Sequence, residues 1–322
     1  MRQYIIRRLF VCIFILLGVS ILIYTLIRVM PGDYVQTMTA GNQNVTEEMK
    51  ISLRKLYGTE TNIVKGYVGW LGKAIQGDFG ESFLYKQPVS EVIKSKMWTS
   101  FTIAFIAYII QMIVAIPLGI ISATKQYSKL DYGVTIFAFI GISLPSFFFA
   151  AILQRIFAFG LEWVPLQGMI TARMDYTGWA LIKDKAWHFI LPIVVLAFLS
   201  IGSIMRYART NMLEVLNADY IRTARAKGLS ERKVIYKHAF RNTLIPIVTM
   251  LGSLLPSLFS GAIITEQIFA IDGLGFTAFK ALKSGDINYM MGFLTFSAVL
   301  TLLGTLLADI LYGVADPRVR LK

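Results

Sequence analysis

The chain has 322 residues, of which 56% are hydrophobic and only 16% are charged. Soluble domains carry roughly 25% charged residues, so this composition places the chain among membrane proteins and excludes an ordinary soluble fold. The net charge is +13 at pH 7, and both a nucleic-acid partner and a membrane topology have to be weighed as its cause.

Apolar runs long enough to cross a hydrocarbon core of about 30 Å recur along the sequence. They predict an all-α integral membrane protein with six transmembrane helices. The first run is too long for a cleaved signal peptide and lacks a small-residue cleavage site, so we expect it to be retained as a span. The predicted spans are residues 9–29, 100–123, 133–158, 188–206, 243–265 and 289–312.

A large loop, residues 30–99, separates the first two predicted spans. Thr46 precedes two glutamates and a series of apolar residues at helical spacing, which predicts an amphipathic helix with Thr46 as its N-cap. Pro88 and the two residues after it predict another short helix that leads into the second span. We expect a loop of this size to form a structured cap, not a domain with its own core.

Four of the predicted spans contain an internal proline, namely Pro117, Pro145, Pro192 and Pro256. Each proline removes a backbone hydrogen bond, so we expect a kink or a local opening of the helix there. Small residues nearby allow helices to approach closely. These features are compatible with a moving gate and with a static bundle. No internal repeat is evident, which disfavours a secondary transporter built from inverted halves.

The distribution of Lys and Arg predicts the orientation. With the N-terminus inside, the cytoplasmic pieces are residues 1–8, 124–132, 206–242 and 313–322, and they hold 17 Lys/Arg against six acids if Asp309 is included. The outer pieces hold 13 residues of each sign. This bias predicts an N-in/C-in topology by the positive-inside rule. The positive charge then reflects topology, and no nucleic-acid partner is expected.

The sequence offers no catalytic set. Cys12 is the only cysteine, so no intrachain disulfide is possible. His188 and His238 are the only histidines and are predicted on opposite sides of the membrane, which excludes a histidine metal site. A phosphate-binding loop, a Ser/His/acid set and a buried carboxylate pair are also missing from the sequence. We expect that the chain is not an enzyme.

The hydrophilic segment 206–242 is the candidate functional site. Asn217 is predicted to cap a short helix at 218–227, which Gly228 would end as the C′ residue. Ser230 is predicted to cap a second helix. A helix–glycine–helix elbow joined to spans on both sides would transmit force to a docked partner. The alternative is a basic loop that lies on anionic lipid headgroups.

A family resemblance covers the chain from end to end. The candidate segment contains the run Asp219-Tyr220-Ile221-Arg222-Thr223-Ala224-Arg225-Ala226-Lys227-Gly228, with His238, Arg241-Asn242 and Pro246 downstream. This run closely resembles the cytoplasmic signature of ABC importer permeases, in particular the dipeptide/oligopeptide/nickel branch. Other stretches typical of that branch are Tyr4 to Leu9, Pro31-Gly32-Asp33, Gly77 to Ser82 with Pro88-Val89, Glu266 to Phe269 with Asp272 to Gly275, and Tyr312 with Asp316-Pro317-Arg318.

Two positions depart from the usual pattern. The general signature opens with Glu-Ala-Ala, whereas Thr223-Ala224-Arg225 stands here, a variant that is ordinary for the peptide branch. Asp272 stands where proline is often found in the family.

The resemblance implies a permease subunit, with residues 1–322 forming a single transmembrane domain of an ATP-driven importer. It would move di- or oligopeptides across a bacterial or archaeal cytoplasmic membrane by alternating access. The implied partners are a homologous second permease subunit in a heterodimer, two ATP-binding subunits, an extracytoplasmic substrate-binding protein and membrane lipid. ATP and Mg would be bound by the partner subunits, and this chain would hold no cofactor.

The resemblance also assigns the ATPase-coupling residues. Ala224 and Gly228 would form the tight contact with an ATP-binding subunit, and Arg225, Lys227 and Arg232 would lie at its rim. The full predicted coupling set is Asp219, Thr223, Ala224, Arg225, Ala226, Lys227 and Gly228.

Two alternatives stay open, one in the cargo and one in the mechanism. The same machine would serve for nickel or oligosaccharides, since the branch resembles carriers of both. An ATP-independent carrier or channel would work without an ATPase partner and would tolerate a bulky residue at Gly228. Gln154 and Glu266 are polar groups near span ends that we assign neither to cargo nor to packing, and no substrate-binding residue is predicted.

Overall fold

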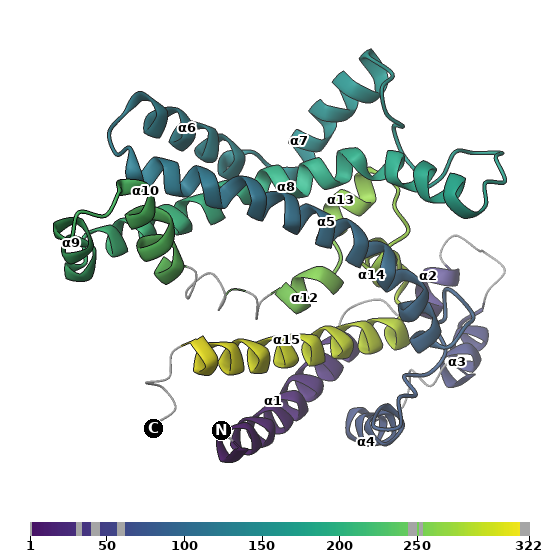
Figure 1. Cartoon of the computed structure of the whole chain (residues 1–322). Coiled ribbons are helices and arrows are strands. Elements are labelled where there is room, and N and C mark those ends of the chain that lie inside the picture. The colour runs from purple at the N-terminus through teal and green to yellow at the C-terminus, as the bar shows by residue number, and fades with distance from the viewer. Residues whose placement is uncertain are drawn as a thin grey trace. The chain divides into compact units, whose positions relative to one another are not determined.

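The computed structural model describes residues 2–29, 34–39, 46–56, 62–243, 250 and 254–315 (Figure 1). These ranges fold into helices and turns without a β-strand, and an isolated antiparallel bridge joins Glu81 to Pro88. The predicted all-α class is confirmed. The chain forms two compact units. Unit 1 comprises Met1–Ser100, Phe259–Ile263 and Asp272–Leu303, and unit 2 comprises Phe101–Leu258, Ile264–Ile271 and Gly304–Lys322.

The helices differ widely in length. In the first half of the chain they are α1 (Arg2–Val29), α2 (Tyr34–Thr39), α3 (Glu47–Leu56), α4 (Ile63–Ala74), α5 (Val89–Thr124), α6 (Lys129–Ser143), α7 (Ser146–Leu153) and the π-helix η1 (Gln154–Gly160). In the second half they are α8 (Gly178–Leu216), α9 (Asp219–Ala226), α10 (Glu231–Lys233), the π-helix η2 (Val234–Ala239), α12 (Leu254–Phe259), α13 (Ile263–Ile268), α14 (Leu274–Ser284) and α15 (Ile287–Ala315).

Four long apolar helices of the described chain are candidates to cross a membrane, namely α1, α5, α8 and α15. They coincide with the predicted spans 9–29, 100–123, 188–206 and 289–312, so a multi-pass membrane protein is confirmed. The helices α5 and α8 are much longer than predicted. With 39 residues, α8 is about 58 Å long, nearly twice the hydrocarbon thickness. The short helix predicted at Pro88 is the first turn of α5, because proline is well tolerated there.

The kink or opening expected at Pro145 is confirmed, and the region predicted as the span 133–158 is not one straight helix. This region consists of α6 followed by α7 and η1, with a bend of 104° between the two parts. Leu144 and Pro145 adopt extended backbone angles at the break. The steric demand of a proline ring disfavours helix at the preceding residue, and proline itself has no N–H to donate. In contrast, α5 and α8 continue through Pro117 and Pro192.

The predicted fifth span, 243–265, is described in part. Residues 244–249 and 251–253, with Pro246, lie outside the described residues, as do the motifs Pro31-Gly32-Asp33 and Asp316-Pro317-Arg318. The described part holds α12, which contains Pro256, and the start of α13. Gly261 separates them with a φ of +74°, a left-handed angle that ends a helix and favours glycine.

The first half of unit 1 follows the predicted pattern. Thr46 caps α3, since its Oγ1 accepts a hydrogen bond of 3.3 Å from the backbone N–H of Met49. The core of unit 1 brings together α5, α14 and α15. Its buried side chains are Val89, Val92, Ile93, Leu274, Ala278, Ala281, Tyr289 and Phe293.

The buried carboxylate of Asp286 joins distant parts of unit 1. It accepts hydrogen bonds from the hydroxyl of Ser82 (2.6 Å) and the backbone N–H of Leu84 (3.0 Å). Its other oxygen accepts the N–H of Tyr289 at 3.0 Å, which caps the first turn of α15. One side chain therefore fixes both the turn before α5 and the start of the last helix.

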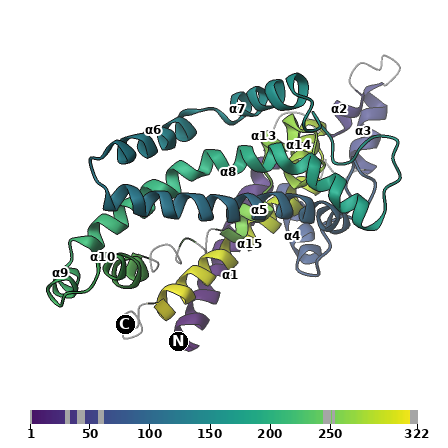
Figure 2. The same cartoon turned by 45° about the horizontal axis from the view of Figure 1, so that its top comes forward.

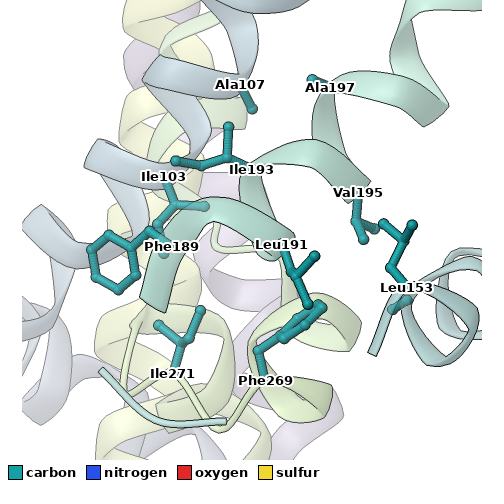
Figure 3. Close-up of a cluster of buried hydrophobic side chains, with 11 residues drawn as sticks. Ile103, Ala107, Leu153, Phe189, Leu191, Ile193, Val195, Ala197, Phe269 and Ile271 are labelled. Atoms are coloured by element: carbon teal, nitrogen blue, oxygen red, sulfur yellow. The ribbon is translucent and has the colours of Figure 1, made fainter. Parts of the chain in front are cut away.

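Unit 2 packs around α8 (Figure 2). Glycines allow its neighbours to approach closely: a Cβ at Gly119 of α5 would lie 2.7 Å from the carbonyl oxygen of Met205. A Cβ at Gly202 of α8 would collide with the carbonyl oxygen of Ala138 in α6. Further along α8, apolar side chains of α5, α7 and residues 269–271 form one buried cluster (Figure 3).

Candidate functional site

The predicted segment 206–242 begins as a continuation of α8, which ends at Leu216. The prediction that Asn217 caps the next helix is wrong. Asn217 is the C-cap of α8, and its side-chain amide donates a 2.9 Å hydrogen bond back to the carbonyl of Leu213. Ala218 occupies the N-cap position of α9 and offers no side-chain cap. An asparagine side chain readily forms a hydrogen bond with a backbone group of the preceding turn. Here that bond stabilises the end of α8 instead of the start of α9.

The helix α9 buries one side against unit 2. Ile221 and Ala224, which are three positions apart and thus on the same helical face, are 0% and 6% exposed. They join a cluster that also includes the end of α5, the end of α8 and η2. The other fully buried members are Ile120, Ala123, Met212, Val234 and Ala239. The elbow is therefore packed onto the ends of two long helices.

The opposite side of α9 is exposed. Asp219, Arg222, Thr223 and Ala226 follow the spacing i, i+3, i+4 and i+7, and all four are exposed. We call these four residues the outer face of α9. Ala226 is the smallest of them and leaves room for a close approach. The hydroxyl of Thr223 donates to the carbonyl of Asp219 at 3.0 Å, within the same helix.

The expected placement of Ala224 has to be corrected. The resemblance placed it at the contact with a partner, whereas its side chain lies in the buried cluster of α5, α8, α9 and η2. The spacing from Ile221 explains this, because an alanine three residues after a buried isoleucine shares its face. Ala226, two positions later, is the small residue on the outer face of α9.

Gly228 forms the bend of the elbow, as predicted. Its φ is +75°, and its N–H donates a 2.9 Å hydrogen bond to the carbonyl of Arg225. Apart from its two chain neighbours, no described residue has an atom within 4 Å of the position that a Cβ would occupy. Glycine is favoured here by backbone conformation and not by a lack of space within this chain.

An ion pair bridges the bend. The guanidinium of Arg225 donates hydrogen bonds of 2.6 and 3.2 Å to the carboxylate of Glu231 in α10. The hydrogen bond from Arg225 lowers the pKa of Glu231 below its ordinary value, and the same bond raises the pKa of Arg225. Both side chains are about half exposed, so the pair contributes modestly to stability. Ser230 stands at the N-cap position of α10 as predicted, but its side chain makes no capping hydrogen bond.

A second polar contact lies near the base of the elbow, and the sequence did not indicate it. Asp131 in the first turn of α6 is buried and accepts hydrogen bonds of 3.1 and 3.2 Å from the guanidinium of Arg209 in α8. It also accepts bonds from the hydroxyl of Ser122 and the N–H of Tyr127. Residues 78 positions apart gave no local signal of this pairing.

The two polar residues left unassigned have packing contacts. The side-chain amide of Gln154 donates to the carbonyl oxygens of Leu166 (3.0 Å) and Ile268 (3.3 Å). Glu266 is 2% exposed within α13. Gln154 thus holds the end of α13 within unit 2. The remaining predicted rim residues, Lys227 and Arg232, are exposed.

Comparison with known proteins gives full-length matches. Residues 115–321 match the family described as "Binding-protein-dependent transport system inner membrane component", and residues 1–104 match the N-terminal family described as "Binding-prot-dependent transport system membrane comp, N-term". The chain is 39% identical over 320 residues to the "Oligopeptide transport system permease protein AppB" of Bacillus subtilis, with 99% of both chains covered.

Two further relatives cover 99% of each chain. A "Putative peptide permease protein" of Brucella suis is 35% identical over 321 residues. The "Di/tripeptide transport system permease protein DppB" of Pseudomonas aeruginosa is 34% identical over 334 residues.

Proposed function

Because the chain belongs to the family of inner membrane components of binding-protein-dependent transport systems, we propose that it is the permease subunit of an ATP-driven peptide importer. In this role it moves di- or oligopeptides across the membrane by alternating access. One observation carries the proposal: the similarity extends over 99% of the chain to proteins named for oligopeptide, peptide and di/tripeptide transport.

The topology that we propose has six spans with both termini in the cytoplasm of a bacterial or archaeal cell. The spans are α1, α5, the bent pair α6 and α7–η1, α8, the segment 243–265 and α15. The excess of Lys and Arg in the four predicted cytoplasmic pieces supports this orientation. Because α8 is nearly twice as long as the hydrocarbon is thick, it is long enough to carry α9 beyond the membrane.

A component of a binding-protein-dependent system works with a substrate-binding protein and with ATPase subunits. We propose a heterodimer with a homologous second permease subunit and two ATP-binding subunits that hold ATP and Mg. The chain itself then hydrolyses nothing. The large loop 30–99 and the other outer loops receive cargo from the extracytoplasmic binding protein.

The docking surface that we propose for an ATP-binding subunit is the outer face of α9 together with Gly228. Ala226 replaces Ala224 as the small residue at the contact, because Ala224 is buried within this chain. Arg225, Lys227 and Arg232 form the rim of this surface. The open space around Gly228 is compatible with a partner backbone that approaches it directly.

The packing of the elbow supports a role in force transmission. A push on the outer face of α9 reaches Ile221 and Ala224, which contact the ends of α5 and α8. A close-packed cluster of this kind moves as one body because interiors are dense and only slightly compressible. The movement of the ATP-binding subunits as they close would thereby be transmitted to α5 and α8 together.

The proposal is tested by uptake in cells that lack the gene. Labelled dipeptides, oligopeptides, nickel and an oligosaccharide are offered to the deletion strain with and without a plasmid copy of the chain. Restored peptide uptake that vanadate blocks is the expected result. Restored uptake of nickel or of the oligosaccharide alone would reassign the cargo, and peptide uptake that continues without the ATPase subunits would establish an ATP-independent carrier.

A further inference from the structure

A cationic pocket lies in unit 1, apart from the elbow. It has a volume of about 400 Å³ and lies between the C-terminal part of α1, the helix α4 and the first turns of α15. Three cations, Arg28, Lys65 and Lys73, line it together with one acid, Asp78. An oxygen of Asp78 accepts the N–H of Gly80 at 2.8 Å, which engages part of the only carboxylate among the described lining residues. The pocket therefore favours an anion.

Trp70, which lines the same pocket, carries a buried hydrogen-bond donor. The ring nitrogen of Trp70 is buried and has no hydrogen-bond partner among the described residues. Tryptophan N–H groups in buried positions usually find an acceptor. The Trp70 ring lies 6.2 Å from that of Tyr24 and 6.5 Å from that of Phe79, so the pocket has an aromatic wall beside its cations. An anion that also carries apolar groups fits these surroundings.

The packing of α4 against α1 indicates where the pocket lies with respect to the bilayer. The hydroxyls of Ser20 in α1 and Tyr67 in α4 are 2.9 Å apart and hydrogen-bonded. Ser20 precedes the end of α1 by nine residues, which is about 13 Å of helix. Gly66 brings the backbone of α4 against the hydroxyl of Tyr24. Helix α4 therefore packs beside α1, which crosses the membrane, and its contact with Ser20 is closer to the bilayer centre than the C-terminal end of α1 is.

One face of α4 is apolar and uncovered within this chain. Val64 and Val68 are 70% and 62% exposed, and Ile75, the C-cap of α4, is 77% exposed. They follow helical spacing and form one stripe. Nearby α1 exposes Leu22 and Leu26. Because α1 crosses the membrane, this stripe continues a lipid-facing surface, as in helices that lie in the interface. Its occupant is therefore the acyl region of the bilayer.

We propose that the pocket binds the phosphate of an anionic phospholipid headgroup. The phosphate lies near Lys65 and Lys73, beside the aromatic wall that contains Trp70, while the acyl chains enter the bilayer beside α1 and α4. Tryptophan, tyrosine and basic side chains are the usual groups at this depth of a membrane. The proposal does not depend on the cargo or on the elbow.

Native mass spectrometry of the purified transporter, with phosphatidylglycerol as the probe, tests this site. The variant with Lys65→Gln and Lys73→Gln should bind phosphatidylglycerol about thirtyfold more weakly, since each basic residue near a membrane surface contributes roughly fivefold. The matched control carries Lys55→Gln and Lys94→Gln, which remove the same charge from unit 1 outside the pocket. Control and wild type should bind equally.

Two further arms identify the source of the phosphate. Inorganic phosphate should not displace the lipid, and phosphatidylcholine should be retained less than phosphatidylglycerol. Displacement of the lipid by inorganic phosphate would mean that the pocket binds a free anion. An equal loss of phosphatidylglycerol binding in the control variant would mean that only the net surface charge matters. Either result overturns the proposal. Unchanged retention in the lysine pair would likewise overturn it.

Discussion

The guanidinium of Arg209 in α8 donates two hydrogen bonds to the carboxylate of Asp131 in α6, at 3.1 and 3.2 Å. The side chain of Asp131 is 5% exposed and that of Arg209 is 27% exposed. A carboxylate that is buried to this degree requires its cation, because an uncompensated buried charge is strongly destabilising. The contact holds the turn between α5 and α6 against α8, close to the base of the elbow.

Replacing Arg209 should therefore destabilise unit 2. Arg209→Met leaves the buried carboxylate without its cation and should lower the free energy of unfolding by about 2–3 kcal/mol. Thermal unfolding of the purified transporter measures the effect. Arg206→Met, one turn earlier on α8 and exposed, is the matched control and should change little. Addition of Asp131→Asn to Arg209→Met should recover part of the loss. If the two single changes add without interaction, the two groups do not form a coupled pair.

Substitutions at Gly228 should separate backbone strain from partner contact. Gly228→Val places a β-branched residue at a φ of +75° and should distort the elbow. Gly228→Asn adopts this angle more readily and adds a side chain in open space. Because the proposed ATPase contact includes Gly228, the asparagine variant should fold normally, bind the ATP-binding subunits more weakly and lose most peptide uptake.

ATPase assembly and uptake are measured in parallel for both Gly228 variants. Full uptake by the asparagine variant would show that no partner approaches this position closely. Full uptake by the valine variant as well would remove the elbow from the transport mechanism.

Ala224 and Ala226 should respond differently to the same change. Ala224→Leu overpacks the cluster of α5, α8, α9 and η2 and should cost about 1–3 kcal/mol of stability. Ala226→Leu adds the same atoms on the exposed outer face of α9 and should leave the melting temperature unchanged. We expect it to weaken ATPase-subunit binding instead. Melting temperature and co-purification of the ATP-binding subunits distinguish the two effects, and a reversed pattern would mean that α9 turns its other side to the partner.

The ion pair between Arg225 and Glu231 should make the elbow mildly sensitive to acid. The pKa of Glu231 is lowered from its ordinary value of 4.5 in the folded chain. The pair thus stabilises the bend above that pH, and the stabilisation is lost as the pH falls through the folded-state pKa. The effect should be below about 1 kcal/mol, since both groups are exposed to solvent.

Hydrogen exchange of the α9 and α10 amides measures this effect of acid. Arg225→Gln should abolish the additional opening of the bend on acidification, relative to the parent chain at the same pH. An equal acid response in this variant would assign the response to other carboxylates.

The elements with a local signature were predicted well from the sequence. Apolar runs located four long helices, and the glycine at 228 located the bend of the elbow, because hydropathy and a left-handed backbone angle are properties of short stretches. A kink or opening was expected at Pro117, Pro145 and Pro192 alike, but the helix is broken at Pro145, and α5 and α8 continue through the other two prolines. In each case the surrounding packing decides between a break and a continuous helix.

The side chains at the candidate site were predicted less well than its outline. The buried position of Ala224 depends on Ile221 and on a cluster contributed by α5, α8 and η2, so it required the tertiary structure. The pair of Asp131 and Arg209 likewise joins residues 78 positions apart. In the sequence, both residues contribute only to the numbers of basic and acidic residues from which the topology is predicted. Long-range pairing leaves no periodic trace in a single sequence.

The hydrogen bonds of Asp286 bear on the order in which parts of the chain fold during synthesis. Its hydrogen bond to Ser82 joins groups 204 positions apart, and the first turns of α5 share a buried cluster with residues of α14 and α15. While the ribosome is still adding the middle of the chain, the first turns of α5 lack these partners. Val89 and Val92 stay uncovered until the last helices emerge. Completion of unit 1 is therefore a late, post-insertion event, and a nascent chain stalled before residue 272 would expose an apolar surface to quality-control proteases.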